Sequence, residues 1–422
     1  MKKVIALVIC VLMVVAVFAA CQAEEAAPAA EEAAEEAAPA AEEDAPAEEP
    51  AEAPTEEEAP AEEPAEEAPA GEPIKLDIGL YADAAGSYYD LLYEAMDGCA
   101  KLDPECDWTI DYQLGQGTAT EQITAVENFI TAGYDVICVI QNSVEATSEC
   151  IAKCEDAGIP YFGLTHDFSS ADNCTDAEGS IAFDFVQAGK YAGLDAAERG
   201  IHKIINIQGV LGQGSAGGQS RGLLLGLEEG GANLGADVED ILINERNAKY
   251  DGTQDTEIVF WGAGEWIADT AQKCMTDAIT SLGPDGFDGV YVHNDPMCEG
   301  VIAAMENAGL DPKDYWIGCC NGREISWQWA KDGIMNLDCN QPAAFEGALA
   351  YQQVKAWAKG EDYRKWIHPY LTPYTEKTIA ELEPTMIPCT DIDKFLEMYE
   401  AGTIDVDINS PEVKDMEAYA GK

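Results

Sequence analysis

The stretch from Asp135 to Phe168 limits the possible folds of this chain more than any other part of the sequence. Val136 to Ile140 is a continuous apolar run, mostly β-branched, which is typical of a strand buried on both faces. Ser143 can cap a helix after it, and Gly158 marks where that helix ends. Tyr161 to Thr165 is a second short, largely apolar run. Strand, helix and strand in so little sequence predict a βαβ unit with a right-handed crossover.

Polar side chains follow both strands of this unit. Gln141 and Asn142 end the first strand, and Thr165, His166 and Asp167 end the second. The carboxyl ends of parallel strands meet at one edge of a sheet, and open α/β sheets bind their ligands there. We therefore expect a ligand site at this edge.

The same alternation of strands and helices continues along the chain. Further strands are predicted at Leu76–Tyr81, Trp108–Leu114, Lys203–Gln208, Ile241–Asn244, Val290–His293 and Trp316–Gly318. Helices are predicted around Leu91–Cys99, from the Thr118–Glu121 capping box to Gly133, at Gln219–Glu229, Trp266–Ser281 and Cys298–Ala308. A break near residues 182–184 separates two series of such units. The pattern predicts an α/β protein of two Rossmann-like lobes, each with a parallel sheet flanked by helices, joined by crossing hinge strands.

The first 73 residues do not belong to this fold. Residues 1–21 join a basic start to an apolar run too short to span a membrane, and they end in Phe-Ala-Ala-Cys, which resembles a bacterial lipobox. We expect a lipoprotein signal peptide with Cys21 as the lipidated residue; the alternative is ordinary signal cleavage beside a chance cysteine. Residues 22–73 are almost entirely Ala, Glu and Pro, with 20 acidic residues and no basic one, which predicts a disordered acidic linker. Whether it spaces a domain from a membrane or is a solvated tail stays open.

The net charge argues against two classes of partner, and the cysteine pattern argues against a zinc site. Beyond the linker, 60 acidic residues stand against 21 basic ones, which argues against nucleic acid and anionic lipid as partners. The 14 cysteines are scattered, and most occupy apolar positions, so we interpret them as small buried hydrophobic residues. Disulfides stay open, since no framework spacing is present. The cysteines and four histidines form no four-ligand zinc set, and we expect no metal and no cofactor.

Segments between residue 75 and about residue 395 carry a family resemblance. They are GLYADAAGSYYDLLYEAM, with two adjacent aromatics, then TAGYDVICVIQNSVEA, AGIPYFGLTHDF, AFDFVQAGKYAG, INIQGVLGQGSAGGQSRGLLLGL, GVYVHNDPMCEGVIAAMENAG and YWIGCCNG. The segment with His-Asn-Asp-Pro-Met is the most specific, because it matches the family's "ND-M--G---A" after the same kind of strand. The chain resembles a type I periplasmic binding protein of the ribose- and galactose-binding kind, in its membrane-anchored lipoprotein form.

The resemblance implies a sugar, or a similar polyol, trapped between two closing lobes and delivered to the permease of an ABC transporter. It implies a protein that is not an enzyme, held by a lipid on the outer side of a bacterial membrane, and we expect a monomer. The N-terminal lobe would comprise residues 75–183 and about 341–378. The C-terminal lobe would comprise residues 184–340 and about 379–422.

Carrying the family pattern over residue by residue assigns ligand contacts to nine positions. Tyr88, Tyr89 and Trp266 would stack on the C–H faces of a sugar ring, and Asn294, Asn321 and Asn340 would hydrogen-bond its hydroxyls. Thr165 and His166 stand where ribose binders carry an Asp-Arg pair, and Gln219 stands where they carry a ligand-binding arginine. The predicted site is thus more neutral and richer in amides, which weakens the case for ribose.

Several of these residues have a purely structural alternative. Tyr89 could pack in a core, Trp266 could be an ordinary aromatic at a helix start, and Asn294 could cap the next helix. His166 beside Asp167 resembles an acid–base pair, but without a nucleophile or metal we interpret it as a hydrogen-bonding wall.

Two functional classes remain after the sequence is considered. The chain shows no Ser-His-Asp, paired-carboxylate or phosphate-loop constellation, which points away from an enzyme. A solute receptor for a transporter and a sensing module that signals to a chemoreceptor or kinase would bind the same ligand, so the sequence does not separate them. A nucleoside, a furanone-type signal or an amino-acid-like compound are alternative ligands. For the last of these, Arg221 is the only cation that we place near the cleft.

Overall fold

The computed structural model describes residues 72–83 and 86–420. The predicted signal peptide, Cys21 and nearly all of the predicted acidic linker lie outside the described residues. Within those ranges, no helix combines the length and the apolar character needed to cross a membrane.

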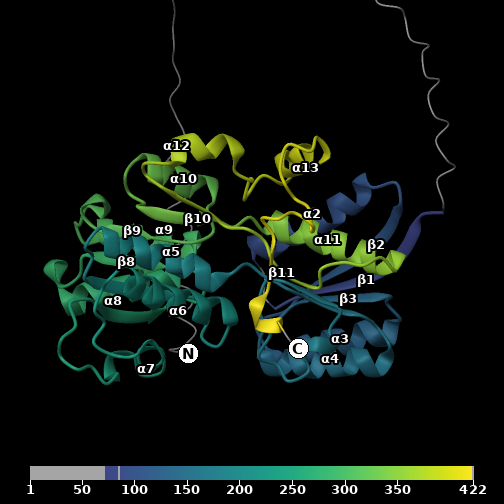
Figure 1. The fold of residues 1–422 in the computed structure, drawn as a ribbon, viewed down its shortest axis with the longest axis horizontal. Coiled ribbons are helices and arrows are strands. Elements are labelled where there is room, and N and C mark those ends of the chain that lie inside the picture. The colour runs from purple at the N-terminus through teal and green to yellow at the C-terminus, as the bar shows by residue number, and fades with distance from the viewer. Residues whose placement is uncertain (1–71, 84–85, 421–422) are drawn as a thin grey trace, which may run out of the picture. The chain divides into compact units, whose positions relative to one another are not determined.

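A first sheet of mostly parallel strands forms one lobe (Figure 1). Its order is β13-β11-β5-β4-β3-β1-β2, with β13 antiparallel to β11. The strands are β1 (Ile74–Ala82), β2 (Cys106–Leu114), β3 (Val136–Ile140), β4 (Tyr161–Leu164), β5 (Gly179–Ile181), β11 (Trp366–His368) and β13 (Lys414–Asp415). All five residues of β3 are buried, which confirms the central strand predicted from its continuous apolar run.

Helices cover both faces of this sheet, as predicted. On one face lie α2 (Ser87–Leu102), α11 (Ala343–Lys359) and α13 (Ile392–Glu400), and on the other lie α3 (Ala119–Ala132) and α4 (Val144–Ala157). The pleat of β3 divides its side chains between the two cores: Cys138 packs with the first group and Val139 with the second. The predicted cap at Thr118 is present, since its hydroxyl accepts from the backbone N–H of Glu121 and donates to the Glu121 carboxylate at 2.8 Å. That carboxylate accepts from the backbone N–H of Gln116, not of Thr118 as a full capping box requires.

A second sheet forms the other lobe, in the order β12-β10-β9-β8-β6-β7 with β12 antiparallel. Its strands are β6 (Lys203–Gln208), β7 (Glu257–Ala263), β8 (Gly289–Val292), β9 (Trp316–Gly318), β10 (Leu337–Asn340) and β12 (Thr372–Thr375). One face carries α5 (Phe185–Glu198), α6 (Gly214–Glu229) and α7 (Val238–Asn244). The other carries α8 (Ala268–Leu282), α9 (Asp295–Asn307), α10 (Glu324–Lys331) and α12 (Ile379–Leu382). The α/β prediction of two helix-flanked parallel sheets is therefore confirmed.

One predicted strand is wrong. Ile241–Asn244 lies in α7, because the Asp237 carboxylate caps this helix by accepting from the backbone N–H of Glu239 at 3.0 Å. The strand that pairs with β6 at this point is β7, whose apolar run follows the Asn-Ala-Lys-Tyr-Asp-Gly turn region. The helix predicted from Gln219 also begins earlier, at Gly214.

Glycines allow α5 and α6 to pack backbone against backbone. A Cβ at Gly222 would lie 2.0 Å from the Val186 carbonyl oxygen, and one at Gly189 would lie 2.1 Å from the Gln219 carbonyl oxygen. Neither Gly189 nor Gly222 could carry a side chain unless the two helices moved apart.

The chain passes between the two sheets at four places, near residues 182–185, 341–342, 369–371 and 386–391. We call the part built on the first sheet the first lobe and the part built on the second sheet the second lobe. The predicted lobe boundaries differ from the structure after residue 371, because β12 pairs in the second sheet whereas α13 and β13 return to the first lobe. The physical reason is the apolar face of α13, whose Phe395 is fully buried in the core of the first lobe.

Cysteines act as core residues in the described part of the chain. Ten of the twelve cysteines in that part are buried. This agrees with their interpretation as small buried hydrophobic residues.

Candidate functional site

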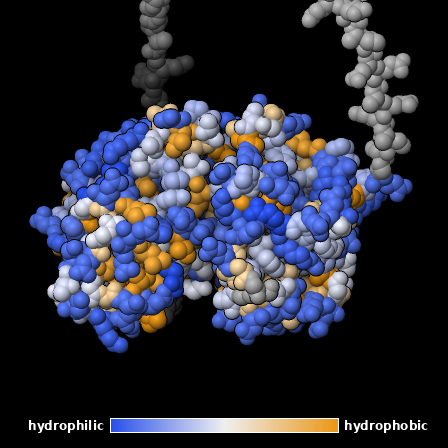
Figure 2. Space-filling view, in the orientation of Figure 1, coloured by the Kyte–Doolittle hydropathy of each residue, from blue (hydrophilic) through white to orange (hydrophobic). Residues whose placement is uncertain are grey.

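A cavity of about 330 Å³ lies between the two lobes, at the carboxyl ends of the strands of both sheets. Figure 2 shows a notch between the two lobes at the lower edge of the view. Eight of the nine predicted site residues line the cavity, namely Tyr88, Tyr89, Thr165, His166, Gln219, Trp266, Asn294 and Asn321. The edge of the first sheet expected to hold a ligand, with Asn142 and Thr165, forms part of its wall.

Asn340 is the predicted site residue that does not line the cavity. Its amide nitrogen instead donates to the carbonyl oxygens of Ile387 at 3.1 Å and Gly322 at 3.3 Å. The next residue, Gln341, lines the wall in its place and donates from Nε2 to the Tyr88 hydroxyl at 3.2 Å. Successive residues of a strand point to opposite sides, so an offset of one residue exchanges the two roles.

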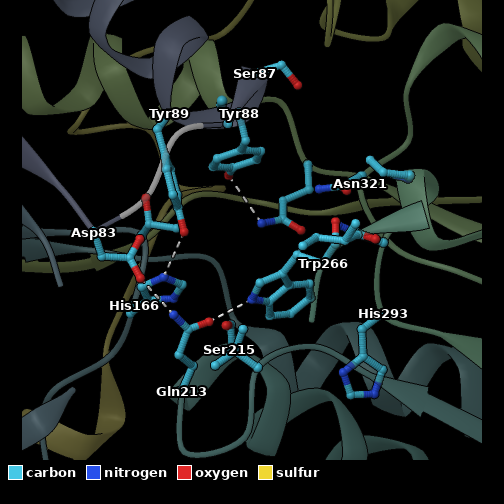
Figure 3. A pocket seen from close by; sticks show the side chains of 18 of the residues that line it. Asp83, Ser87, Tyr88, Tyr89, His166, Gln213, Ser215, Trp266, His293 and Asn321 are labelled. Carbon is cyan, nitrogen blue, oxygen red and sulfur yellow. Dashed lines mark hydrogen bonds between the residues drawn. The ribbon is translucent and has the colours of Figure 1, made fainter. Parts of the chain in front are cut away.

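The ring of Tyr88 lines the cavity (Figure 3), and Glu346 of α11 binds its hydroxyl. The hydroxyl donates to Oε2 of Glu346 at 3.1 Å, and the same carboxyl oxygen accepts from the Thr165 hydroxyl at 3.0 Å. Burial raises the pKa of Glu346 to about 8, so this group is mostly protonated at neutral pH. Thr165 therefore helps to fix the Glu346 carboxyl group that binds Tyr88, and the Tyr88 ring lines the cavity.

Tyr89, His166 and Asp83 form the adjoining corner of the first lobe (Figure 3). The Tyr89 hydroxyl lies 3.3 Å from His166 Nε2. Burial lowers the pKa of His166 to about 4, so the ring is neutral at pH 7. Burial, with the charge of Asp83 as the next cause, raises the pKa of Tyr89 well above its ordinary value. These residues form a hydrogen-bonding wall, which matches the interpretation of His166 from the sequence.

Trp266 enters the cavity from the second lobe in an unusual backbone conformation. Both Glu265 and Trp266 have positive φ, at 56° and 63°, a region that costs free energy for residues other than glycine. The indole lies against the backbone of Gly209, where a Cβ would be 2.0 Å from the Cζ2 atom of the ring. Its Nε1 donates to Oε1 of Gln213 at 2.6 Å. The contacts with Gly209 and Gln213 thus hold the indole at the cleft ahead of α8, in a backbone conformation that costs free energy.

Asn294 both caps a helix and lines the cavity, the two alternatives given for it from the sequence. Its Oδ1 accepts from the backbone N–H of Met297 at 2.9 Å, which caps α9, and the residue also lines the cavity. Gln219 lines the cavity as well, but its amide donates to the His293 carbonyl at 3.1 Å and accepts from the Tyr291 hydroxyl at 2.9 Å. Burial lowers the pKa of His293 to about 3, so a neutral ring is held at the base of the site.

A buried acid pair lies beneath the second-lobe wall. Ligand atoms of Asp295, Asp338 and Cys319 lie within 4.8 Å of one another, in a cluster that has the spacing of a metal site. Burial raises the pKa of Asp338 to about 6, and burial with the charge of Asp338 raises the pKa of Asp295 well above its usual value. The raised pKa values favour one proton held between the two carboxyl groups, which removes one negative charge from the pair. Asp295 begins α9 and Asp338 lies in β10, so the pair joins the two elements next to Asn294 and Gln341.

Several polar residues of the wall were not predicted from the sequence, among them Asp83, Gln213, Arg323 and Gln341. Asp83 and Gln341 come directly after strands, which is the signal that could have identified them. Arg221, the cation expected near the cleft, is instead an exposed partner of Glu239 at 2.7 Å. Arg323 is the arginine of the cavity wall, and its Nη1 donates to Glu299 at 3.0 Å.

Comparisons with known proteins give one family. A model of the periplasmic binding protein domain matches residues 81–362. A protein of Rhizobium meliloti named for rhizopine binding is 24% identical over 314 residues, which are 74% of this chain and 93% of the relative. A xylitol-binding protein of Mycolicibacterium smegmatis is 26% identical over 306 residues, or 72% of this chain and 78% of that protein.

Solved structures share the fold. The crystal structure of an ABC transporter solute binding protein from Bacillus halodurans with bound myo-inositol has a TM-score of 0.61 and 20% sequence identity. The similarity covers 74% of this chain and 99% of that chain. The named relatives are solute-binding proteins and not enzymes, in agreement with the class expected from the sequence.

Proposed function

Because the chain belongs to the periplasmic binding protein family, we propose that it captures a sugar or polyol between its two lobes and delivers it to an ABC transporter. The relatives named for rhizopine and xylitol binding, and the similar structure with bound myo-inositol, support a polyhydroxylated ligand. The partner in delivery is the transporter permease, and the site of action is the outer side of a bacterial membrane.

The observation that carries the proposal is the pairing of aromatic faces with amides around one cavity. Tyr88 enters from the first lobe and Trp266 from the second, with Asn321 beside them (Figure 3). Gln341 lines the same cavity. Aromatic planes cover the C–H faces of a sugar or cyclitol, and amides can both donate to and accept from its hydroxyls. The two histidines stay neutral, so they add no net charge at pH 7. This chemistry suits a neutral, hydroxyl-rich molecule better than an anion.

Thermal-shift screening of residues 72–422 against xylitol, myo-inositol, hexoses, pentoses and nucleosides tests the ligand class. A molecule that binds the folded form alone must raise the melting temperature. We expect a polyol or sugar to do so. A shift with nucleosides alone would contradict the proposed ligand class.

Trp266→Ala and Tyr88→Ala are each expected to weaken binding of that polyol or sugar by roughly ten- to a hundredfold. Each change exposes one face of the ligand and removes about 1.5–3 kcal/mol of apolar burial. Titration calorimetry of both variants measures the loss, and their unliganded melting temperatures serve as the control. Unchanged affinity together with a large loss of unliganded stability would assign Trp266 to the core and contradict this wall of the site.

We propose that Cys21 is the first residue of the mature protein and carries lipid, because an apolar run precedes it and an acidic Ala/Glu/Pro segment follows. Mass spectrometry of the native protein is expected to show the loss of residues 1–20 and an acylated amino terminus. A soluble, secreted protein with another mature start would refute the anchor and leave the binding function unaffected.

A further inference from the structure

The residue before α6 reaches across the cleft. Gln213 belongs to the second lobe, and its Nε2 donates to Oδ2 of Asp83, which follows β1 in the first lobe, at 3.0 Å (Figure 3). A Cβ at the neighbouring Gly214 would lie 3.0 Å from the Asp167 carbonyl oxygen of the first lobe. The start of α6 therefore touches the opposite wall at two points.

The orientation of the Gln213 amide follows from its second partner. An indole N–H can only donate, so the atom 2.6 Å from Trp266 Nε1 must be the amide oxygen. The amide nitrogen then faces Asp83, and its N–H bonds to a carboxylate. Gln213 and Asp83 are 6% and 3% exposed, so this bond is shielded from water.

We propose that Gln213 is a positioning residue that latches the two lobes together and at the same time holds the Trp266 indole against the ligand space. The inference rests on the proposed function, in which the lobes open and close around a ligand. One side chain then joins the hydrogen-bond chain Trp266–Gln213–Asp83, which spans the cleft when it is closed.

The latch has a consequence for the unliganded protein. The bond between Gln213 and Asp83 joins two protein groups, so it forms without any ligand and favours the closed arrangement in its absence. Opening breaks this bond and also frees the indole, whose backbone has positive φ. The unliganded wild-type protein is therefore expected to be nearly as compact as the structure described here.

Gln213→Leu tests the latch without any ligand. The change keeps the size of the side chain and removes both hydrogen bonds. Small-angle scattering of unliganded residues 72–422 is expected to give a larger radius of gyration than for the wild type. Hydrogen exchange in the segment 209–218 is expected to rise roughly tenfold, as for the loss of a buried hydrogen bond to a charged group.

A matched pair of variants separates the latch from a general loss of structure. Gln213→Glu places a carboxylate against Asp83 and should open the unliganded protein, because like charges repel at short range. Adding Asp83→Asn to this variant lets the amide at position 83 donate to the carboxylate at position 213. The radius of gyration should then return toward the wild-type value. Gln328→Leu makes the same amide-to-apolar change on the exposed face of α10, where the amide bonds to Asp332, and should leave the radius unchanged.

Two outcomes would overturn the latch. One is an equal radius and equal exchange in the unliganded wild type and Gln213→Leu. The other is a double variant that stays as open as Gln213→Glu alone. Neither result depends on which ligand binds, so the latch can fail while the thermal-shift screen still supports the proposed function.

Discussion

Glu346→Gln is expected to raise the free energy of unfolding at pH 8.5 by several kcal/mol and to flatten its dependence on pH. Glu346 lies fully buried on α11, and burial raises its pKa from 4.5 to about 8. Between these values the folded state holds a proton that the unfolded state has released, so stability falls as pH rises. A shift of this size corresponds to about 5 kcal/mol, present in full below pH 4.5 and lost by about pH 8. Glutamine resembles the protonated form and keeps an acceptor for Tyr88 and Thr165.

Chemical denaturation of wild type and Glu346→Gln from pH 5 to pH 9 measures this effect. The net charge of −57 adds a repulsive contribution that also varies with pH, but both proteins share it. Glu155→Gln, at an exposed position of α4, controls for the loss of one acidic group. Curves that run parallel for wild type and Glu346→Gln would show that Glu346 is ionised in the folded protein at neutral pH.

Gly222→Ala is expected to destabilise the protein by about 1–3 kcal/mol or more, although alanine is the better helix former. The added Cβ would lie 2.0 Å from the Val186 carbonyl oxygen, so α6 would have to move away from α5. Because α6 begins next to Gln213, the same movement should also weaken binding. Equilibrium denaturation and the affinity for the best polyol or sugar of the screen measure the two effects.

Gly217→Ala is the matched control in the same helix. A Cβ at this position would meet no atom within 4 Å. The substitution should therefore stabilise the protein by about 0.5–1 kcal/mol through helix propensity alone. If both variants were equally stable, close contact between α5 and α6 would not explain the glycines at this interface.

Apolar runs, helix caps and glycine stops in the sequence correctly predicted the elements whose conformation depends on their own residues. The run from Val136 to Ile140, the cap at Ser143 and the stop at Gly158 are all found where they were expected. The strand predicted at Ile241–Asn244 was wrong because these four residues fit either a strand or one turn of a helix. The cap at Asp237 decides for the helix. Short hydrophobic runs carry too little periodicity to resolve this choice.

The site was predicted best where a side chain directly follows a strand or enters from a first helical turn, as for His166 and Tyr88. Contacts between distant segments could not be predicted in this way. Gln213 contacts Asp83, 130 positions earlier, only because two lobes meet there, and no local pattern encodes that meeting. The error of one residue, by which Asn340 was predicted in place of Gln341, arose because the end of β10 could not be located in the sequence.

The return of α13 and β13 to the first lobe affects the order in which this protein can fold. The first lobe is assembled from three separated segments, and its edge strand β13 ends at Asp415, a few residues from the carboxyl terminus. A chain that emerges amino end first cannot complete that lobe until α13 and β13 have appeared. Such long-range pairing delays folding.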